Sequence, residues 1–161
     1  SAKMKRHECI VALSNTEAID TADDSVINLQ QGDIYPVLKK GKKNYLIWAQ
    51  EKHLKIATNK IGKMVFAPCF TQPVCAELKG LSRGIMLSPT LGHAVEVLIP
   101  SGLYPTLRNI MLNNRDIWYE LQVQDNLGVR IIWIKDRYFT LHLRTCQDLG
   151  RIRHKPTKQN Q

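Results

Sequence analysis

A short sequence that occurs twice constrains the fold of this chain more than any other feature. The first copy, GDIYPVLK, covers residues 32–39, and the second, SGLYPTLR, starts 69 residues later and covers residues 101–108. Each copy is followed by a polar or basic turn, an aromatic strand pattern, and a glycine that precedes another apolar strand pattern. A unit that recurs at this spacing is typical of a duplicated small domain. We therefore predict an all-β chain of two tandem small barrels rather than one sheet.

The length of the chain fits two small domains. Each half, of about 75 residues, can bury only some 60% of the surface that its unfolded chain exposes, so we expect the halves to stabilise one another through a shared face. Glycine and proline between positions 71 and 84 indicate a linker, which we place near Gly80. The predicted domains cover residues 5–78 and 82–147, a polar stretch at 14–25 is predicted as a long loop, and residues 148–161 form a basic flexible tail.

The charge of the chain is strongly positive and unevenly distributed. The formal net charge is +9, which favours binding to polyanions. Between positions 39 and 63 there are eight lysines and a single acid, Glu51, whereas acidic residues gather just upstream. A surface charged only for solubility does not require this segregation, so we interpret the lysines as a binding surface.

The candidate nucleic-acid-binding residues follow from this distribution. The loop at 39–43 is predicted as an exposed hairpin turn whose ammonium groups displace counterions from phosphates, the alternative being a solvated turn. In the second half arginine replaces lysine, and ion pairing with nearby acids is the competing explanation. The complete set is Lys39, Lys40, Lys42, Lys43, Lys52, Lys55, Lys60, Lys63, Arg108, Arg115, Arg151, Arg153 and Lys155.

The sequence lacks the motifs of enzymes and metal sites. The four cysteines lie far apart without a CxxC pair, and the five histidines include no HxxxH pair. Cys9 and Cys69 are interpreted as small apolar strand residues, and Trp48, Trp118 and Trp133 as core residues. We predict a non-enzymatic protein without metal or cofactor. With no signal-peptide or membrane-span pattern, we expect a reduced, cytoplasmic protein, although a mature secreted form fits equally well.

The first half resembles the SH3 domains of eukaryotes. Ala12 and Leu13 match the start of their Ala-Leu-x-x-Tyr motif, residues 31–34 match their Gly-Asp turn, and residues 67–70 lie near their Pro-x-x-Tyr motif. The tryptophan that opens their ligand groove is replaced around Asn44, which argues against binding of proline-rich peptides. The resemblance implies a small SH3-like barrel.

The second half is similar to bacterial SH3 domains, whose Leu-x-Val-Leu, Trp-Tyr and Gly-x-x-x-Trp-Ile strands correspond to residues 103–107, 118–119 and 128–134. Residues 31–33 with Val37, Gly41 and Lys42 also resemble the KOW motif of Tudor-like barrels, in which a basic loop meets nucleic acid. In size, charge and fold type the chain is similar to DNA-binding early proteins of T-even phages that modify host transcription. These resemblances imply two tandem SH3-like barrels.

We therefore predict a DNA-binding protein that contacts phosphates of duplex DNA largely independently of sequence and modulates transcription or nucleoid organisation. RNA, or an acidic nucleoid or transcription protein, is the alternative partner. A peptide-binding or cell-wall-binding SH3-type module is the alternative function, and it predicts an exposed aromatic groove.

Overall fold

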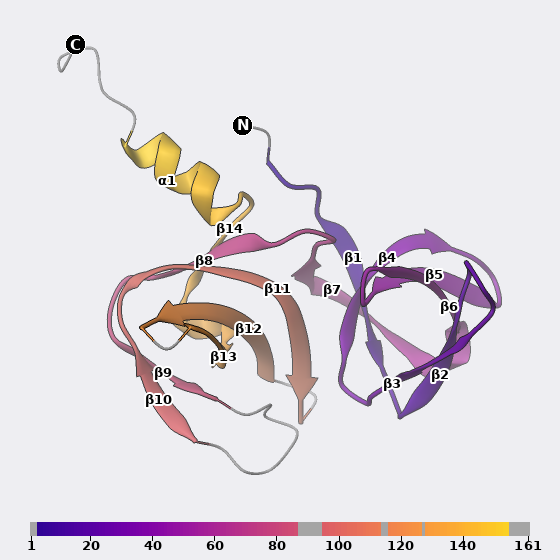
Figure 1. The fold of residues 1–161 in the computed structure, drawn as a ribbon. Coiled ribbons are helices and arrows are strands. Elements are labelled where there is room, and N and C mark those ends of the chain that lie inside the picture. The colour runs from indigo at the N-terminus through magenta and orange to yellow at the C-terminus, as the bar shows by residue number, and fades with distance from the viewer. Residues whose placement is uncertain (1–2, 87–94, 114–115, 127, 155–161) are drawn as a thin grey trace.

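The chain forms two antiparallel sheets of seven strands each in the computed structural model, which describes residues 3–86, 95–113, 116–126 and 128–154 (Figure 1). Strands account for 62% of the structure and helices for 11%. The predicted all-β class is therefore confirmed.

The first sheet contains the strands of the N-terminal half in the order β3-β2-β6-β5-β4-β1-β7. The elements along the chain are β1 (His7–Ala12), β2 (Thr16–Asp20), β3 (Val26–Leu29), β4 (Ile34–Lys40), β5 (Asn44–Ala49), β6 (Lys52–Ala57), the 3₁₀ helix η1 (Thr58–Lys60) and β7 (Ile61–Cys69).

The second sheet has the order β10-β9-β13-β12-β11-β8-β14. Its elements are β8 (Val74–Leu78), β9 (Ser82–Ile85), β10 (Glu96–Ile99), β11 (Gly102–Leu112), β12 (Asp116–Asp125), β13 (Gly128–Lys135), the 3₁₀ helix η3 (Asp136–Tyr138) and β14 (Thr140–His142). The helix α1 (Cys146–His154) follows them.

The two sheets repeat one strand order. Counting the strands of each half from one to seven gives the order 3-2-6-5-4-1-7 in both, and each half has a 3₁₀ helix between its sixth and seventh strands. The repeated Tyr-Pro pair lies in the fourth strand of each half, as Tyr35 and Pro36 in β4 and as Tyr104 and Pro105 in β11. The repeated sequence thus occupies the same position in two copies of one topology.

The division between the sheets lies earlier in the chain than the linker expected near Gly80. Strand β8 pairs with β11 and β14, so residues 74–78 belong to the second sheet rather than to the first half. The last strand of the first sheet ends at Cys69, and residues 70–73 connect the two sheets.

Residues 14–25 contain a strand where a long loop was expected. In β2, Thr16, Ala18 and Asp20 are buried and alternate with the exposed Glu17 and Ile19. This is the period-2 pattern of a strand. The buried residues of this strand are small or polar. Because no large apolar residue marks the buried face, the strand could not be recognised from the sequence pattern.

A hydrophobic core is shared by the two halves. One cluster of buried side chains contains Val11 and Ile34 of the first sheet together with Leu78, Leu121 and Ile132 of the second. A separate cluster, which includes Ile47 and Leu54, lies within the first half. The shared cluster confirms the expectation that the halves bury a common face.

The turn before β4 contacts β11 of the other half directly. The backbone N–H of Met111 donates a 2.8 Å hydrogen bond to the carbonyl oxygen of Gly32, and Asp33 forms an isolated antiparallel bridge with Ile110. Gly32 has a φ of +90°, and a Cβ atom at this position would lie 2.6 Å from the Met111 carbonyl oxygen. Both the backbone conformation and the close approach of the halves therefore require glycine here.

We predict that Gly32→Ala destabilises the fold more than Gly128→Ala does. Gly128 also has a positive φ, of +116°, but no described atom lies within 4 Å of the position that a Cβ atom would take there. Its replacement should lower the free energy of unfolding by about 1–2 kcal/mol, the cost of a left-handed alanine. Gly32→Ala should cost more because the new methyl group also displaces β11. Denaturant unfolding measures both variants, and equal effects would contradict the close contact between Gly32 and β11.

All four cysteines are paired, which corrects the expectation of a reduced protein. Cys9 of β1 and Cys69 of β7 form one disulfide, and Cys75 of β8 and Cys146 of α1 form the other. Their Cα atoms are 5.5 and 4.7 Å apart, distances that a disulfide spans without backbone movement. Disulfides of this kind persist in oxidising compartments.

We predict that denatured, unreduced protein shows no thiol that reacts with a thiol-specific chromogenic reagent. The linked cysteines are 60 and 71 residues apart. Loops of this length correspond to a stabilisation of about 4 kcal/mol per cross-link in the chain-entropy model, so reduction should lower the midpoint of thermal unfolding. Four reactive thiols per chain before reduction would rule out the pairing.

The C-terminal segment forms a helix up to residue 154, where a flexible tail was expected from residue 148. The Thr145 hydroxyl accepts a 3.1 Å hydrogen bond from the backbone N–H of Asp148 and caps the first turn of α1. Leu149 is buried, and Arg153 donates two hydrogen bonds, of 2.7 and 2.8 Å, to the Glu77 carboxylate of β8. The disulfide of Cys146 and these contacts hold the helix against the second sheet.

The Glu77 carboxylate also meets His142 of β14, whose Nε2 atom lies 2.8 Å from Glu77 Oε1. The hydrogen bonds from Arg153 and His142 lower the pKa of Glu77 to about 2. Because folding lowers the pKa of Glu77, its carboxylate stabilises the fold at pH values above the pKa that the group has in the unfolded chain. This stabilisation disappears as the pH falls toward 2.

We predict that Glu77→Gln lowers the free energy of unfolding at pH 6 by about 1–3 kcal/mol, the usual value for hydrogen bonds to a charged group. The difference between variant and parent should shrink as the pH falls from 4 to 2. Arg151→Gln is the control, because among the described residues Arg151 forms only an exposed pair with Asp148, at 3.7 Å, and its loss should change stability by less than about 0.5 kcal/mol. Denaturant unfolding at several pH values tests this, and a difference independent of pH would contradict it.

Candidate functional site

The predicted lysine loop is the turn of the β4–β5 hairpin. A Cβ atom on Gly41 would lie 2.5 Å from the Asn44 carbonyl oxygen, so the tight turn accepts only glycine there. The backbone N–H of Thr58 in η1 donates a 2.9 Å hydrogen bond to the Lys43 carbonyl oxygen, and the Thr58 hydroxyl donates to the carbonyls of Lys42 and Lys43 at 3.3 and 3.2 Å. These hydrogen bonds connect the loop to the 3₁₀ helix η1.

A shallow hollow of about 390 Å³ lies beside this hairpin, and we call it the lysine hollow. Lys55 of β6 joins the loop there, because Lys55 pairs with Leu46 of β5 in the sheet and Leu46 pairs with Lys39 of β4. Its lining residues are Lys39, Lys40, Gly41, Lys42, Lys43, Asn44, Tyr45, Leu46 and Lys55. The sheet thus gathers five of the eight predicted lysines around one hollow.

Most of these lysines carry an uncompensated charge. Lys40 forms a 2.5 Å ion pair with Glu8, and this hydrogen bond raises the pKa of Lys40. Among the described residues, Lys39, Lys42, Lys43 and Lys55 have no ion-pair partner. Four ammonium groups without acids beside them create a positive field at this end of the first sheet.

The other predicted lysines lie outside the lysine hollow. Lys52 begins β6 and lies 3.8 Å from Asp20. Lys60 ends η1 and Lys63 lies on β7, and both are exposed.

The predicted arginines that the structure describes are all in ion pairs. Arg151 pairs with Asp148 and Arg153 with Glu77. Arg108 pairs with Asp33 and Glu120. Arg115 and Lys155 lie outside the described residues. In the second half, ion pairing therefore accounts for the described candidates.

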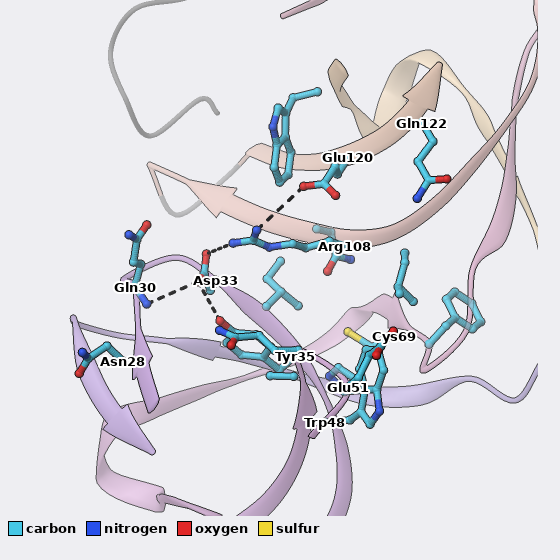
Figure 2. Close-up of a pocket in the computed structure, with 18 residues that line it drawn as sticks. Asn28, Gln30, Asp33, Tyr35, Trp48, Glu51, Cys69, Arg108, Glu120 and Gln122 are labelled. Carbon is cyan, nitrogen blue, oxygen red and sulfur yellow. Dashed lines mark hydrogen bonds and ion pairs between the residues drawn. The ribbon is translucent and has the colours of Figure 1, made fainter. Parts of the chain in front are cut away.

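A second concave site lies between the two halves, where sequence reasoning placed no site. This interdomain cleft has a volume of about 650 Å³ and is shown in Figure 2. The first half contributes the turn before β4, the start of β4 and the β5–β6 turn, and the second half contributes β11, β12 and β13. The side chains that determine its character are Asp33, Tyr35, Trp48, Glu51, Arg108, Glu120 and Trp133.

The Asp33 carboxylate links the two walls of the cleft. Its side chain is 7% exposed and accepts hydrogen bonds from the Tyr35 hydroxyl at 2.8 Å and from the Gln30 backbone N–H at 3.4 Å. Arg108 Nη2 of the other half donates to Asp33 Oδ1 at 3.4 Å (Figure 2). Burial and the neighbouring carboxylate raise the pKa of Tyr35, so its hydroxyl stays protonated as a donor.

Arg108 also faces its own sheet. Its Nη1 atom lies 3.9 Å from Glu120 Oε2, and its guanidinium lies 5.8 Å from the ring centre of Trp133. Burial raises the pKa of Glu120, an effect that the charge of Arg108 partly offsets. The only signal for this network in the sequence is that Asp33 and Arg108 lie in the two copies of the repeated sequence.

Comparison of the chain with protein-family models, curated proteins and solved structures finds no match. Within the described ranges, no three histidine, cysteine, aspartate or glutamate side chains gather as a metal site. No helix in the described part of the chain is long and apolar enough to cross a membrane.

Proposed function

We propose that the protein is a non-enzymatic DNA-binding protein whose lysine hollow contacts the phosphates of duplex DNA. The observation that carries this proposal is the grouping of the unpaired Lys39, Lys42, Lys43 and Lys55 around one hollow. Each ammonium group at a phosphate releases a counterion, which drives binding without reading bases.

We further propose that each half is a small SH3-like barrel. The repeated strand order and the 3₁₀ helix before the last strand of each half support this assignment. In KOW-containing barrels, which the first half resembles, a basic loop meets nucleic acid. We assign the basic β4–β5 hairpin to that loop. Because all four cysteines are paired, the proposed binding is to be measured on the oxidised protein.

Duplex DNA suits the lysine hollow better than a single strand or a peptide does. Proteins that hold single strands use exposed aromatic rings as stacking platforms. Tyr45 is the aromatic residue that lines the hollow, and it is only 8% exposed. A lysine-rich surface without an exposed aromatic ring therefore favours duplex DNA, bound through its phosphates and independently of sequence. The hollow itself therefore does not provide the aromatic groove that a peptide-binding or cell-wall-binding module requires.

We predict that replacing Lys39, Lys42, Lys43 and Lys55 together by alanine weakens binding to unrelated DNA duplexes about equally. The slope of log K against log salt should flatten by about three to four, since each neutralised phosphate contributes about 0.9. Fluorescence anisotropy at several salt concentrations measures the slope.

A charge-matched control separates the lysine hollow from the overall charge. Alanine at the exposed Lys3, Lys5, Lys79 and Arg83 removes the same number of charges at positions outside the hollow. This variant should keep most of the slope. Equal losses in both variants would assign binding to net charge alone, and no binding at micromolar protein in low salt would end the DNA proposal. Tighter binding of an RNA duplex would instead favour the alternative nucleic-acid partner.

A further inference from the structure

The interdomain cleft is separate from the lysine hollow. The hollow lies at the start of β5, around Asn44, whereas Trp48 and Ala49 at the end of β5 line the cleft. A strand rises about 3.3 Å per residue, so the two sites are roughly 15 Å apart along β5. At about 650 Å³, the cleft is within the size range of small-molecule sites.

The charge of the cleft is opposite to that of the whole protein. Among the described residues, the carboxylates of Asp33, Glu51 and Glu120 line it together with one cation, Arg108. The Asp33 carboxylate has three hydrogen-bond partners, whereas the described interaction of Glu120 is its 3.9 Å pair with Arg108. Glu51 has no partner among the described residues. Two carboxylates therefore have unused capacity to accept a charged donor.

Aromatic and amide side chains accompany these carboxylates. Trp48 lies near Glu51 at one end of the cleft, and Gln122 lies on the opposite wall (Figure 2). The Trp48 side chain is partly exposed, while Tyr35 and Trp133 are buried behind the surface. A partly exposed indole face beside a carboxylate is an arrangement that attracts organic cations, because the ring face is negative and the alkyl stem packs against it.

The turn that presents Glu51 adopts an unusual backbone conformation. Gln50 and Glu51 have φ values of +52° and +61°, in the left-handed region that hairpin turns usually fill with glycine or asparagine. Both side chains line the cleft. Residues other than glycine are strained in this conformation. Placing the side chains of Gln50 and Glu51 in this turn therefore costs free energy.

We propose that the interdomain cleft binds a small organic cation, an alkylammonium or guanidinium group on a short apolar stem. Glu120 and Glu51 accept the hydrogen bonds of the charged group, Trp48 packs against the stem, and the Gln122 amide supplies a further polar contact. Because Glu51 and Trp48 belong to the first half and Glu120 and Gln122 to the second, the ligand contacts both halves.

Calorimetry with matched probes tests this on the intact, oxidised protein. The probes are agmatine, n-pentylamine and the neutral isostere n-pentanol. We expect agmatine and n-pentylamine to bind with a Kd of about 1 mM or tighter, and n-pentanol not to bind measurably. Equal binding of n-pentanol, or no binding of either amine, would overturn the proposal.

Two variants and a control locate the site. Glu51→Gln should weaken amine binding about three- to fivefold, as expected for an exposed charge, and Glu120→Gln by more. Glu17→Gln removes one exposed carboxylate from β2, outside the cleft, and should leave binding unchanged. A loss with Glu17→Gln as large as with Glu51→Gln would assign the effect to general charge.

A measurement on the parent protein covers the case in which Glu120→Gln does not fold. The indole N–H resonance of Trp48, assigned with Trp48→Phe, should shift on titration with n-pentylamine and not with n-pentanol. An unmoved resonance at saturating amine would refute the site. DNA binding should be the same in the parent and in Glu51→Gln, so failure of the cation proposal is distinguishable from failure of the DNA proposal.

Discussion

The buried Asp33 carboxylate requires a cation, and Arg108 of the other half supplies it. A carboxylate with a side chain only 7% exposed is costly unless it is paired and hydrogen-bonded, and Tyr35 and Gln30 supply only neutral donors. Its charge is met by Arg108 of β11, which brings the second sheet against the turn before β4. The backbone hydrogen bond from Met111 to Gly32 lies beside this ion pair and fixes the distance between the halves. The interdomain cleft lies at this contact, and the shared core adds buried apolar contacts between the same two halves.

The net charge of the protein conceals two local fields of opposite sign. The lysine hollow concentrates unpaired cations at one end of β5, and the interdomain cleft concentrates carboxylates at the other. A ligand responds to the local field rather than to the formal charge of +9. The field at the hairpin therefore attracts negative charge, whereas the carboxylates of the cleft attract positive charge. This separation allows both proposed ligands to bind one chain at the same time.

The sequence predicted those features that are encoded locally. The repeated sequence revealed the duplication because its turn and Tyr-Pro strand recur in the same order, and the lysine loop was found because its cations are contiguous. Helix α1 was missed because Cys75 and Glu77, more than 65 residues away, hold it in place. The cleft was missed for the same reason, since Asp33 and Arg108 are separated by 75 residues and meet only when the sheets pack. Long-range contacts of this kind have no periodic signal in a single sequence.

The connection between the sheets limits how far the halves can move. Residues 70–73 are flanked by Cys69 and Cys75, and each of these cysteines is cross-linked within its own half, to β1 and to α1 respectively. Phe70 and Val74, at the two ends of the connection, are also buried. A short connection fixed at both ends restricts hinge motion about the Asp33–Arg108 contact, so the walls of the cleft are held near one separation before any ligand arrives. Binding in such a preformed cleft loses less conformational entropy than binding that must first bring two mobile domains together.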